Sequence, residues 1–455
     1  MLGLGKTGLS MAKWLTRQGA RIAVADSRAS PPNADALRAA CPDAEITTGG
    51  FARSAFEGID LIAISPGVPL STPEVRVAQA QGVPVAGDIE FFAQALRGSG
   101  RRPATKILGI TGSNGKSTVT AMAGVMCLNA GLRTVVAGNI GPAVLDELMQ
   151  AEDNGEHPQA WVLELSSFQL ETTSSLNLDA AAVLNLSQDH LDRYAGIADY
   201  AAAKARIFFG DGVQILNRDD AAVLAMRIPG RNSVTFGINQ PVAQGDWGMR
   251  ALGSADWMVQ GGERVLQVSA LKLVGRHNAA NALAALALAR AIDLPLAPLI
   301  TALAGFEGLP HRMQKIATLR GVPFFNDSKG TNVGATLAAL NGLASPAVLI
   351  AGGDGKGQNF TPLAAAVAAH ARAVVLIGRD ADRIALALAA TGVPLLRAND
   401  MAQAVEIALA TAQAGDAVLL SPACASFDMF RDYAHRGESF ATAVGNLGER
   451  LGNAR

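Results

Sequence analysis

The stretch ILGITGSNGKSTVT, residues 107–120, has the features of a nucleotide-binding phosphate loop with unusual spacing. The common pattern is G-x-x-x-x-G-K-[ST], but Ile110 stands where that pattern has its first glycine. Gly112 supplies the missing flexibility two residues later, and Gly115 precedes Lys116. Apolar residues before the loop predict a strand, and a helix is expected from about Lys116. The helix would direct its positive end and its free N–H groups at one phosphate.

The residue types in this loop suit ATP and a magnesium ion. The two glycines allow positive φ angles, which turn backbone N–H groups inward. Lys116 adds a cation, and the hydroxyl of Ser117 or Thr118 can bind Mg²⁺. The alternative is a plain strand-to-helix turn with a capping serine, and it leaves G-K-S-T after an apolar strand unexplained. The residues expected to contact ATP here are Gly112, Ser113, Asn114, Gly115, Lys116, Ser117 and Thr118.

Composition excludes several classes of protein. A chain of 455 residues should hold about three domains, and 49% hydrophobic with 17% charged residues indicates a well-packed globular protein. A net charge of −1 gives no bulk attraction to nucleic acid or to anionic membranes. Three distant cysteines, Cys41, Cys127 and Cys424, favour a reducing compartment and predict neither disulfides nor zinc. With no signal core and no long apolar run, a cytoplasmic protein without membrane insertion is expected.

Apolar runs alternate with helical stretches along the chain, which predicts parallel sheets covered by helices. A helix is expected over 8–20 in the first segment. We expect an α/β fold of three domains: a Rossmann-like domain over 1–97, a central P-loop ATPase-like domain over 98–304 and a Rossmann-like domain over 305–455. The boundaries follow a polar linker at 97–106 and the segment GLPHRM at 308–313. Strands are expected over 21–26, 61–67, 106–111, 133–138, 161–166, 180–187, 322–327, 347–353, 373–378 and 417–422.

The chemically distinctive residues follow these strands. They are TGSNGKST, ELSSFQLE, NLSQDHLD, NDSKGTN, GGDGK and SPACAS. In parallel α/β sheets, ligands bind beyond the carboxyl ends of the strands. These clusters are therefore expected on the ligand-binding edges of the sheets.

The N-terminal segment carries GLGKTG at 3–8, a G-x-G-x-x-G pattern with Asp26 further along. Alone, this pattern is typical of an NAD-binding Rossmann domain, and it is a weak signal. The chain opens at Met1 directly on the glycine turn, so the preceding strand is expected to be missing, through a late start site or a shortened chain. That would weaken the N-terminal domain and its ligand binding.

The loop TGSNGKST resembles the ATP loop of the Mur ligases, the cytoplasmic amino-acid-adding enzymes of peptidoglycan synthesis. Folylpolyglutamate synthases share a related loop. The other motifs of the Mur ligases follow in order, and over nearly the whole chain their combination is similar to members that add D-glutamate to UDP-N-acetylmuramoyl-L-alanine. These motifs are GNIG, ELSSFQLE, NLSQDHLDRY, YAAAKARI, GRHNAANALAA, LPHR, NDSKGTN, GGDGK and SPACASFD.

The resemblance implies that the protein uses ATP, D-glutamate and two Mg²⁺ ions. Glu164 would bind Mg²⁺ with Ser117, although a helix-capping acid is the alternative. His190 would be a ligand of the second metal or of the substrate, although a single histidine is often structural. Lys204 would carry a carbamate made with CO₂ and so bind the second ion, which needs a neutral, partly desolvated amine first. Without the resemblance, Lys204 would be taken as a solvated surface lysine.

The remaining site residues also come from the resemblance. Asn278 would contact adenine, with a helix N-cap as the alternative. Arg312 would contact the ATP phosphates, with a linker salt bridge as the alternative, and Asp327 would contact the ribose. The D-glutamate site would use Thr331, Lys356, Ser426 and Tyr433. The UDP-substrate site would use Gly5, Lys6, Thr7, Gly8, Asp26, Ser27, Arg28, Ser65, Gly67 and Asn139.

The expected activity is ATP-dependent peptide-bond formation through an acyl phosphate, by a monomer with small-molecule substrates and no nucleic-acid partner. Lys116, His190 and Lys204 are the expected catalytic residues. Two other classes stay open at this point: an NAD-dependent oxidoreductase, which leaves Glu164 and Lys204 unexplained, and a nucleotide-gated regulatory binder without turnover. Within the family, ligases that add L-alanine or a diamino acid are the nearest alternatives.

Overall fold

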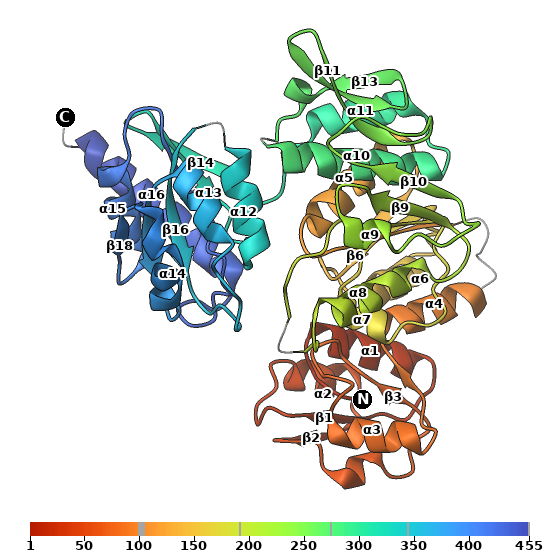
Figure 1. The fold of residues 1–455 in the computed structure, drawn as a ribbon. Coiled ribbons are helices and arrows are strands. Elements are labelled where there is room, and N and C mark those ends of the chain that lie inside the picture. Colours follow the sequence, from red (N-terminus) through yellow and green to blue (C-terminus); the bar gives the residue numbers. More distant parts are fainter. Residues whose placement is uncertain (99–104, 191–192, 274, 344, 454–455) are drawn as a thin grey trace.

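The structure is a computed structural model, and it describes residues 1–98, 105–190, 193–273, 275–343 and 345–453. Three bodies follow one another along the chain, and the third lies beside the middle one (Figure 1). The three-domain α/β prediction is therefore confirmed, while the exact domain boundaries stay predictions. Most of the first linker, residues 99–104, lies outside the described residues.

The central body is built on one sheet with strand order β13-β12-β11-β10-β9-β8-β5-β7-β6. Its strands from β6 to β11 pair in parallel, whereas β11, β12 and β13 form an antiparallel extension. The strands are β5 (Lys106–Thr111), β6 (Thr134–Gly138), β7 (Ala160–Glu164), β8 (Ala180–Val183), β9 (Val213–Asn217), β10 (Ser233–Phe236), β11 (Trp247–Leu252), β12 (Ala255–Gln260) and β13 (Glu263–Gln267). The four strands predicted around the phosphate loop are confirmed, and the antiparallel extension was not predicted.

Helices cover both faces of the central sheet. On one face α5 (Lys116–Asn129), α10 (Arg276–Ala291) and α11 (Leu296–Gly305) pack together over a core of small and branched side chains. The opposite face carries α4 (Asp88–Gly98), α6 (Val144–Asp153), α7 (Ser167–Glu171) and α8 (Ile197–Ala205), with the short α9 (Ala221–Leu224) beside β9. Burial on both faces explains why the central strands are continuous apolar runs.

The C-terminal body has the strand order β14-β15-β19-β16-β17-β18. All neighbours are parallel except β14 and β15, which form a hairpin. The strands are β14 (Gln314–Leu319), β15 (Val322–Asn326), β16 (Ala347–Gly352), β17 (Ala371–Ile377), β18 (Leu395–Arg397) and β19 (Ala417–Leu420). Helices α12 (Val333–Gly342), α13 (Leu363–His370) and α14 (Ala381–Leu388) cover one face, and α15 (Met401–Thr411) and α16 (Tyr433–Asn453) cover the other. The four strands predicted here are confirmed.

The N-terminal body has short strands: β1 (Ala23–Asp26) pairs with β2 (Glu45–Thr48), and β3 (Ile62–Ala63) pairs with β4 (Val85–Ala86). Its helices are α1 (Lys6–Arg17), α2 (Ala34–Ala40) and α3 (Pro73–Ala80). The helix expected over 8–20 is confirmed with a shift of two to three residues, and the strand expected over 61–67 is much shorter.

The first residues of the chain lie where a first strand was expected to be missing. Leu2 forms parallel bridges to both Ala25 and Ile64, so it lies between β1 and β3 where a central strand is needed. The Leu2 N–H donates to the Ala63 carbonyl at 2.8 Å, and the Gly3 N–H donates to the Ala25 carbonyl at 2.8 Å. These bridges are isolated, and no strand precedes α1 in the described residues, so the absence of a full first strand stays a prediction.

Two further observations concern the whole chain. Each body contains one cysteine, and all of them, Cys41, Cys127 and Cys424, are free and buried. Within the described part of the chain, each helix is too short or too polar to cross a bilayer.

Candidate active site

The phosphate loop connects the carboxyl end of β5 to α5. Gly112 and Gly115 have φ angles of +147° and +85°, as predicted. Side chains are also sterically excluded there, since a Cβ on Gly115 would come within 2.5 Å of the Asn281 Oδ1. The neighbouring loop after β8 supports the turn: the Ser113 N–H donates to the Asn185 carbonyl, and the Asn114 N–H donates to the Asn185 Oδ1. The positive φ angles expected at the two glycines are therefore present.

Lys116 and Ser117 lie at the start of α5. The Lys116 Nζ donates to the carbonyls of Gly112 and Ser113, both at 2.9 Å, so the ammonium group lies under the loop. Burial lowers the pKa of Lys116, while Glu164 and Asp189 act in the opposite direction. The Arg312 Nη2 donates to the Ser117 Oγ at 2.5 Å. Two cationic side chains thus converge on this end of the helix.

Arg312 comes from the loop between α11 and β14, at the boundary of the central and C-terminal bodies. Its contact with Ser117 brings the boundary segment to the phosphate loop. A salt bridge confined to the linker, the alternative considered for this arginine, is not its observed contact.

Glu164 ends β7 and is 2% exposed. Its Oε1 accepts from the Asn139 Nδ2 at 2.5 Å, whereas its Oε2 is buried with no hydrogen-bond partner in the structure. A buried carboxylate oxygen without a donor is costly unless a cation compensates it. Magnesium commonly binds proteins through one or two carboxylates together with substrate phosphates. No group of three His, Cys, Asp or Glu side chains suited to a metal ion occurs in the described residues.

Lys204 lies on α8 and is 1% exposed. Its Nζ donates to the Gly112 carbonyl at 2.8 Å and lies 4.4 Å from the centre of the Tyr200 ring. Burial lowers the pKa of Lys204 well below its ordinary value, and the Lys116 charge acts in the same direction. The interpretation of Lys204 as a solvated surface lysine is wrong, because α8 turns this side chain under the phosphate loop. The partly desolvated environment expected for it is present.

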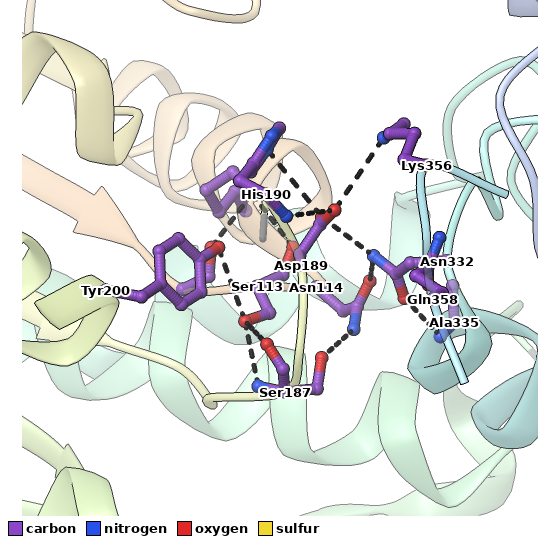
Figure 2. A network of polar contacts seen from close by, with 12 residues as sticks. Ser113, Asn114, Ser187, Asp189, His190, Tyr200, Asn332, Ala335, Lys356 and Gln358 are labelled. Carbon is purple, nitrogen blue, oxygen red and sulfur yellow. Dashed lines mark hydrogen bonds and ion pairs between the residues drawn. The ribbon is translucent and has the colours of Figure 1, made fainter. Parts of the chain in front are cut away.

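His190 and Asp189 lie in the loop after β8. The His190 Nε2 is 3.7 Å from the Asp189 Oδ2, and the imidazole packs against Phe168 with 4.7 Å between ring centres. Burial acts to raise the pKa of Asp189, but His190, Lys356 and Lys116 hold it below its ordinary value. Figure 2 shows Asp189 at the centre of a polar network that joins this loop to the C-terminal body.

A cavity of about 340 Å³ opens beside the phosphate loop, between the central and C-terminal bodies. Asn114, Asn278, Arg312 and Asp327 are among its lining residues. Asn278 is the third residue of α10, and Gly275 is the N-cap, so the N-cap alternative for Asn278 is wrong. The cavity brings together the residues that the resemblance assigned to adenine, phosphate and ribose.

Asp327 is buried at the floor of this cavity, where its Oδ2 accepts from the Ser421 hydroxyl at 2.7 Å. Burial raises the pKa of Asp327 to about 7, although Ser421 and Arg312 act to lower it. The carboxyl group can therefore change its charge near neutral pH.

The residues expected at the D-glutamate site come from three loops of the C-terminal body. Lys356 follows β16 with a φ of +48°, and its Nζ is 3.7 Å from the Asp189 Oδ1. Thr331 precedes α12, Ser426 is buried after β19, and Tyr433 begins α16. All four residues belong to the C-terminal body, and the Lys356 side chain extends from it to Asp189 in the central body.

Sequence reasoning missed several residues of this region. The Lys329 Nζ lies 3.7 Å from the centre of the Tyr433 ring, and burial lowers the pKa of Lys329 to about 8. Asn281 contacts Asn278, and Asn332 donates to Asp189. Lys329 and Asn332 belong to the NDSKGTN motif, from which only Asp327 and Thr331 were predicted as site residues.

The N-terminal residues lie around the glycine turn at 3–8. Asp26 accepts from the Leu4 N–H at 2.6 Å and from the Arg28 guanidinium at 2.8 and 2.7 Å. Hydrogen bonding to Arg28 is the main reason that the pKa of Asp26 lies far below its ordinary value. Both carboxylate oxygens are therefore already used within the loop. In an NAD-binding domain the corresponding acid accepts from the ribose hydroxyls.

The other N-terminal candidates have mixed exposure. Ser65 and Gly8 are buried, Gly5 and Thr7 are half-buried, and Lys6, Ser27, Arg28 and Gly67 are exposed. Asn139 lies apart from them in the central body, where its Nδ2 donates to the Glu164 Oε1. Arg193 joins the two bodies: its guanidinium donates to the Pro66 carbonyl at 2.7 Å and to the Glu171 Oε2 at 2.5 Å.

Comparisons with known proteins bear on the whole chain. The profile of the Mur ligase MurD-like N-terminal domain matches residues 1–87, that of the Mur ligase middle domain matches 110–289, and that of the Mur ligase glutamate ligase domain matches 311–424. UDP-N-acetylmuramoylalanine–D-glutamate ligase of Nitrosospira multiformis is 60% identical, over 98% of this chain and 95% of its own. The protein of the same name from Nitrosomonas europaea is 57% identical with the same coverage.

Solved structures with the same fold are much less similar in sequence. UDP-N-acetylmuramate-alanine ligase MurC from Thermotoga maritima has a TM-score of 0.61 at 18% identity, over 98% of both chains. MurF from Acinetobacter baumannii has a TM-score of 0.62 at 18% identity, over 95% of this chain and 92% of its own. These two comparisons support the arrangement of domains.

Proposed function

Since the chain belongs to the Mur ligase family, we propose that it adds D-glutamate to UDP-N-acetylmuramoyl-L-alanine with ATP, releasing ADP and phosphate. The relatives that are 60% and 57% identical carry this activity in their names. The reaction belongs to peptidoglycan precursor synthesis, and we place it in the cytoplasm of a bacterium, carried out by a monomer.

One observation carries the proposal: the unpartnered Oε2 of Glu164 lies buried among the groups that surround the phosphate loop. Lys116 and Arg312 supply positive charge at the same place. An NAD-dependent oxidoreductase needs neither this oxygen nor these cations. Use of the Asp26 oxygens by Leu4 and Arg28 further weakens that alternative.

The first chemical step activates an unreactive acid. The L-alanyl carboxylate of the UDP-linked substrate attacks the γ-phosphorus of ATP, the bond to the β-phosphate oxygen breaks, and an acyl phosphate and ADP result. Lys116 and Arg312 would stabilise the negative charge that builds up on the transferred phosphoryl group. Both side chains lie near the start of α5, where backbone N–H groups would also face the phosphates.

Mg²⁺ would be held by the Ser117 hydroxyl and the Glu164 carboxylate, and when bound it neutralises charge on the phosphate oxygens. Binding would require the Arg312 guanidinium to leave the Ser117 Oγ and turn to the phosphates. We expect two ions, the second held near His190 and a carbamate on Lys204. In that modification the neutral Lys204 amine attacks CO₂, loses a proton and becomes an anion.

The second chemical step forms the amide bond. The amine of D-glutamate attacks the acyl carbon, a tetrahedral intermediate forms, and its collapse releases phosphate. We assign Lys356, Thr331 and Ser426 to the carboxylates of the amino acid, since a cation and hydroxyls suit a dicarboxylate. The Tyr433 ring would contact its side chain. The glycine turn at 3–8, with Ser65 and Arg28, would hold the UDP group.

The direct test is phosphate release by the purified protein with ATP, Mg²⁺ and UDP-N-acetylmuramoyl-L-alanine, with and without D-glutamate. Release only in the presence of D-glutamate is expected, and a panel with L-alanine and a diamino acid distinguishes the related ligases. Lys116→Ala should abolish release, because it removes the ammonium group from the loop. An unchanged rate in this variant, or NADH formation with a hydroxy acid, would refute the proposal.

A further inference from the structure

Asn332 is the N-cap of α12 and is 3% exposed. Its Oδ1 accepts from the Ala335 N–H at 2.8 Å, which determines the orientation of the amide because only the oxygen can face that N–H. The Nδ2 then points out of the C-terminal body. It donates to the Asn114 Oδ1 at 3.1 Å and to the Asp189 Oδ2 at 3.2 Å.

The two acceptors belong to the two catalytic loops of the central body. Asn114 lies in the phosphate loop, where its own Nδ2 donates to the Ser187 Oγ at 3.3 Å. Asp189 neighbours His190 and faces Lys356. Figure 2 shows Asn332 between these loops, with both of its N–H bonds directed at the central body. A single buried amide therefore touches the phosphate loop and the Asp189 loop at once.

Asn332 is also rigidly connected to the residues proposed to bind D-glutamate. Thr331 precedes it in the chain. The next residue, Val333, donates its N–H to the Gln358 Oε1 at 3.0 Å, and the Gln358 Nε2 donates to the Gly355 carbonyl at 3.0 Å. Gly355 adjoins Lys356. The segment around Asn332 and the Lys356 loop therefore move together.

We propose that Asn332 is a positioning residue that couples the D-glutamate site to the phosphate loop by fixing the C-terminal body against Asn114 and Asp189. The inference rests on the proposed function for the identity of the amino acid. Nucleotide bound at the phosphate loop would further stabilise Asn114 and with it the hydrogen-bonded position of Asn332, and this position would bring Thr331 and Lys356 to the reaction. By thermodynamic linkage, D-glutamate strengthens nucleotide binding by the same factor.

The test uses substitutions that retain the helix cap. Ser and Asp are good N-caps, so Asn332→Ser keeps the cap and removes the two donated hydrogen bonds. Asn332→Asp keeps the cap and places a carboxylate against Asp189. The matched control is Asp400→Ser, since Asp400 caps α15 through the Gln403 N–H at 2.8 Å and is exposed.

The measurement is calorimetric titration of D-glutamate into the full-length protein, with and without a non-hydrolysable ATP analogue and Mg²⁺. We expect the analogue to tighten D-glutamate binding in the unmodified protein and in Asp400→Ser. In Asn332→Ser, the enhancement of D-glutamate affinity by the analogue should be about tenfold smaller, which corresponds to about one hydrogen bond to a charged group. In Asn332→Asp, the enhancement should be smaller still. D-glutamate affinity without the analogue should fall less than affinity with it in Asn332→Ser and Asn332→Asp, and should be unchanged in Asp400→Ser.

The outcomes separate the inference from the proposed function. An unaltered enhancement in Asn332→Asp, or an equal loss of affinity with and without analogue, overturns the inference, as does an unmodified protein without any enhancement. If the unmodified protein neither binds D-glutamate nor forms product, the proposed function fails. Small-angle scattering then tests the inference independently: the analogue should compact the unmodified protein, and equal compaction of Asn332→Asp would overturn the role of Asn332.

Discussion

At the scale of single residues, Lys204 shows what sequence alone could not decide. An Ala-rich helix gives no sign of which side faces the protein, and lysine is normally exposed. The structure buries this side chain against the Gly112 carbonyl and lowers its pKa through burial. The resemblance to a family identified Lys204 as a site residue. The structure adds the physical reason: the amine lies beneath the phosphate loop, where burial makes it easier to deprotonate.

We expect Lys204 to react with CO₂, because carbamate formation needs the neutral amine that burial favours. Carbon-13 NMR of protein in labelled bicarbonate should show a carbamate resonance that is missing in Lys204→Arg. The same substitution should lower ligase activity by about 100-fold or more, equivalent to about 3 kcal/mol of transition-state stabilisation. A resonance of equal intensity in the variant would assign the modification elsewhere.

Glu164→Gln is expected to raise the Mg²⁺ concentration needed for half-maximal activity by about tenfold or more, since it removes the charge of the unpartnered oxygen. Initial rates over a series of Mg²⁺ concentrations measure the effect. Glu147→Gln on α6 is the control and should leave the Mg²⁺ dependence unaltered. Identical curves for Glu164→Gln and the unmodified protein would exclude Glu164 as a ligand.

The pKa of Asp327 predicts a pH dependence of stability. It is raised by burial from an ordinary 3.8 to about 7, so the folded state binds this proton more tightly than the unfolded state does. Stability contributed by the protonated form is therefore lost as the pH rises from about 4 to about 7. Asp327→Asn does not titrate. Its unfolding free energy, compared with that of the unmodified protein, should gain about 2–4 kcal/mol between pH 5 and pH 8. Urea unfolding at both values measures this difference, and a pH-independent difference would contradict it.

At the scale of elements, the sequence predicted the strands with long apolar runs and missed β9 and β10 of the central sheet. Continuous apolar runs such as 347–353 and 417–422 correspond to β16 and β19. The extension β11–β13 was missed, because its strands are only partly buried and therefore lack the continuous apolar runs of the other strands. The phosphate loop and its helix were predicted with their bounds almost correct, since glycines and capping residues mark them locally. Contacts between bodies, such as Arg312 with Ser117, depend on folding and could not be read from spacing.

The glycine pattern at the start of α1 allows close packing of the helix as well as the proposed ligand binding. A Cβ on Gly8 would come within 2.0 Å of the Gly3 carbonyl oxygen, whereas one on Gly5 would meet nothing within 4 Å. Gly8→Ala should therefore cost about 1–3 kcal/mol of stability and lower the first calorimetric transition. Gly5→Ala should unfold at the temperature of the unmodified protein. Equal melting of the two variants would show that α1 can shift freely.

At the scale of the whole molecule, Arg193 joins the N-terminal and central bodies. Its guanidinium donates to the Pro66 carbonyl from Nη1 and to Glu171 from Nη2, whereas a lysine has a single donor nitrogen. Arg193→Lys should raise the KM for the UDP-linked substrate several-fold, since Pro66 lies between Ser65 and Gly67, and leave the KM for ATP unaltered. Steady-state kinetics check both values.

Arg206→Lys is the control for this prediction, because Arg206 donates to the Leu170 and Thr173 carbonyls within the central body. Its KM values should match those of the unmodified protein. A joint rise of both KM values in Arg193→Lys would instead indicate general loosening of the structure.

The distribution of the cysteines gives each body its own built-in probe. Cys41, Cys127 and Cys424 lie one to a body, and burial raises the pKa of Cys127 and of Cys424 to about 12. Because thiolates are the reactive form, alkylating reagents should not modify these buried cysteines in the native protein. Mass spectrometry after brief alkylation in denaturant would then report which body opens first. Fluorescent dyes could likewise be attached at newly introduced surface cysteines without removing the natural ones.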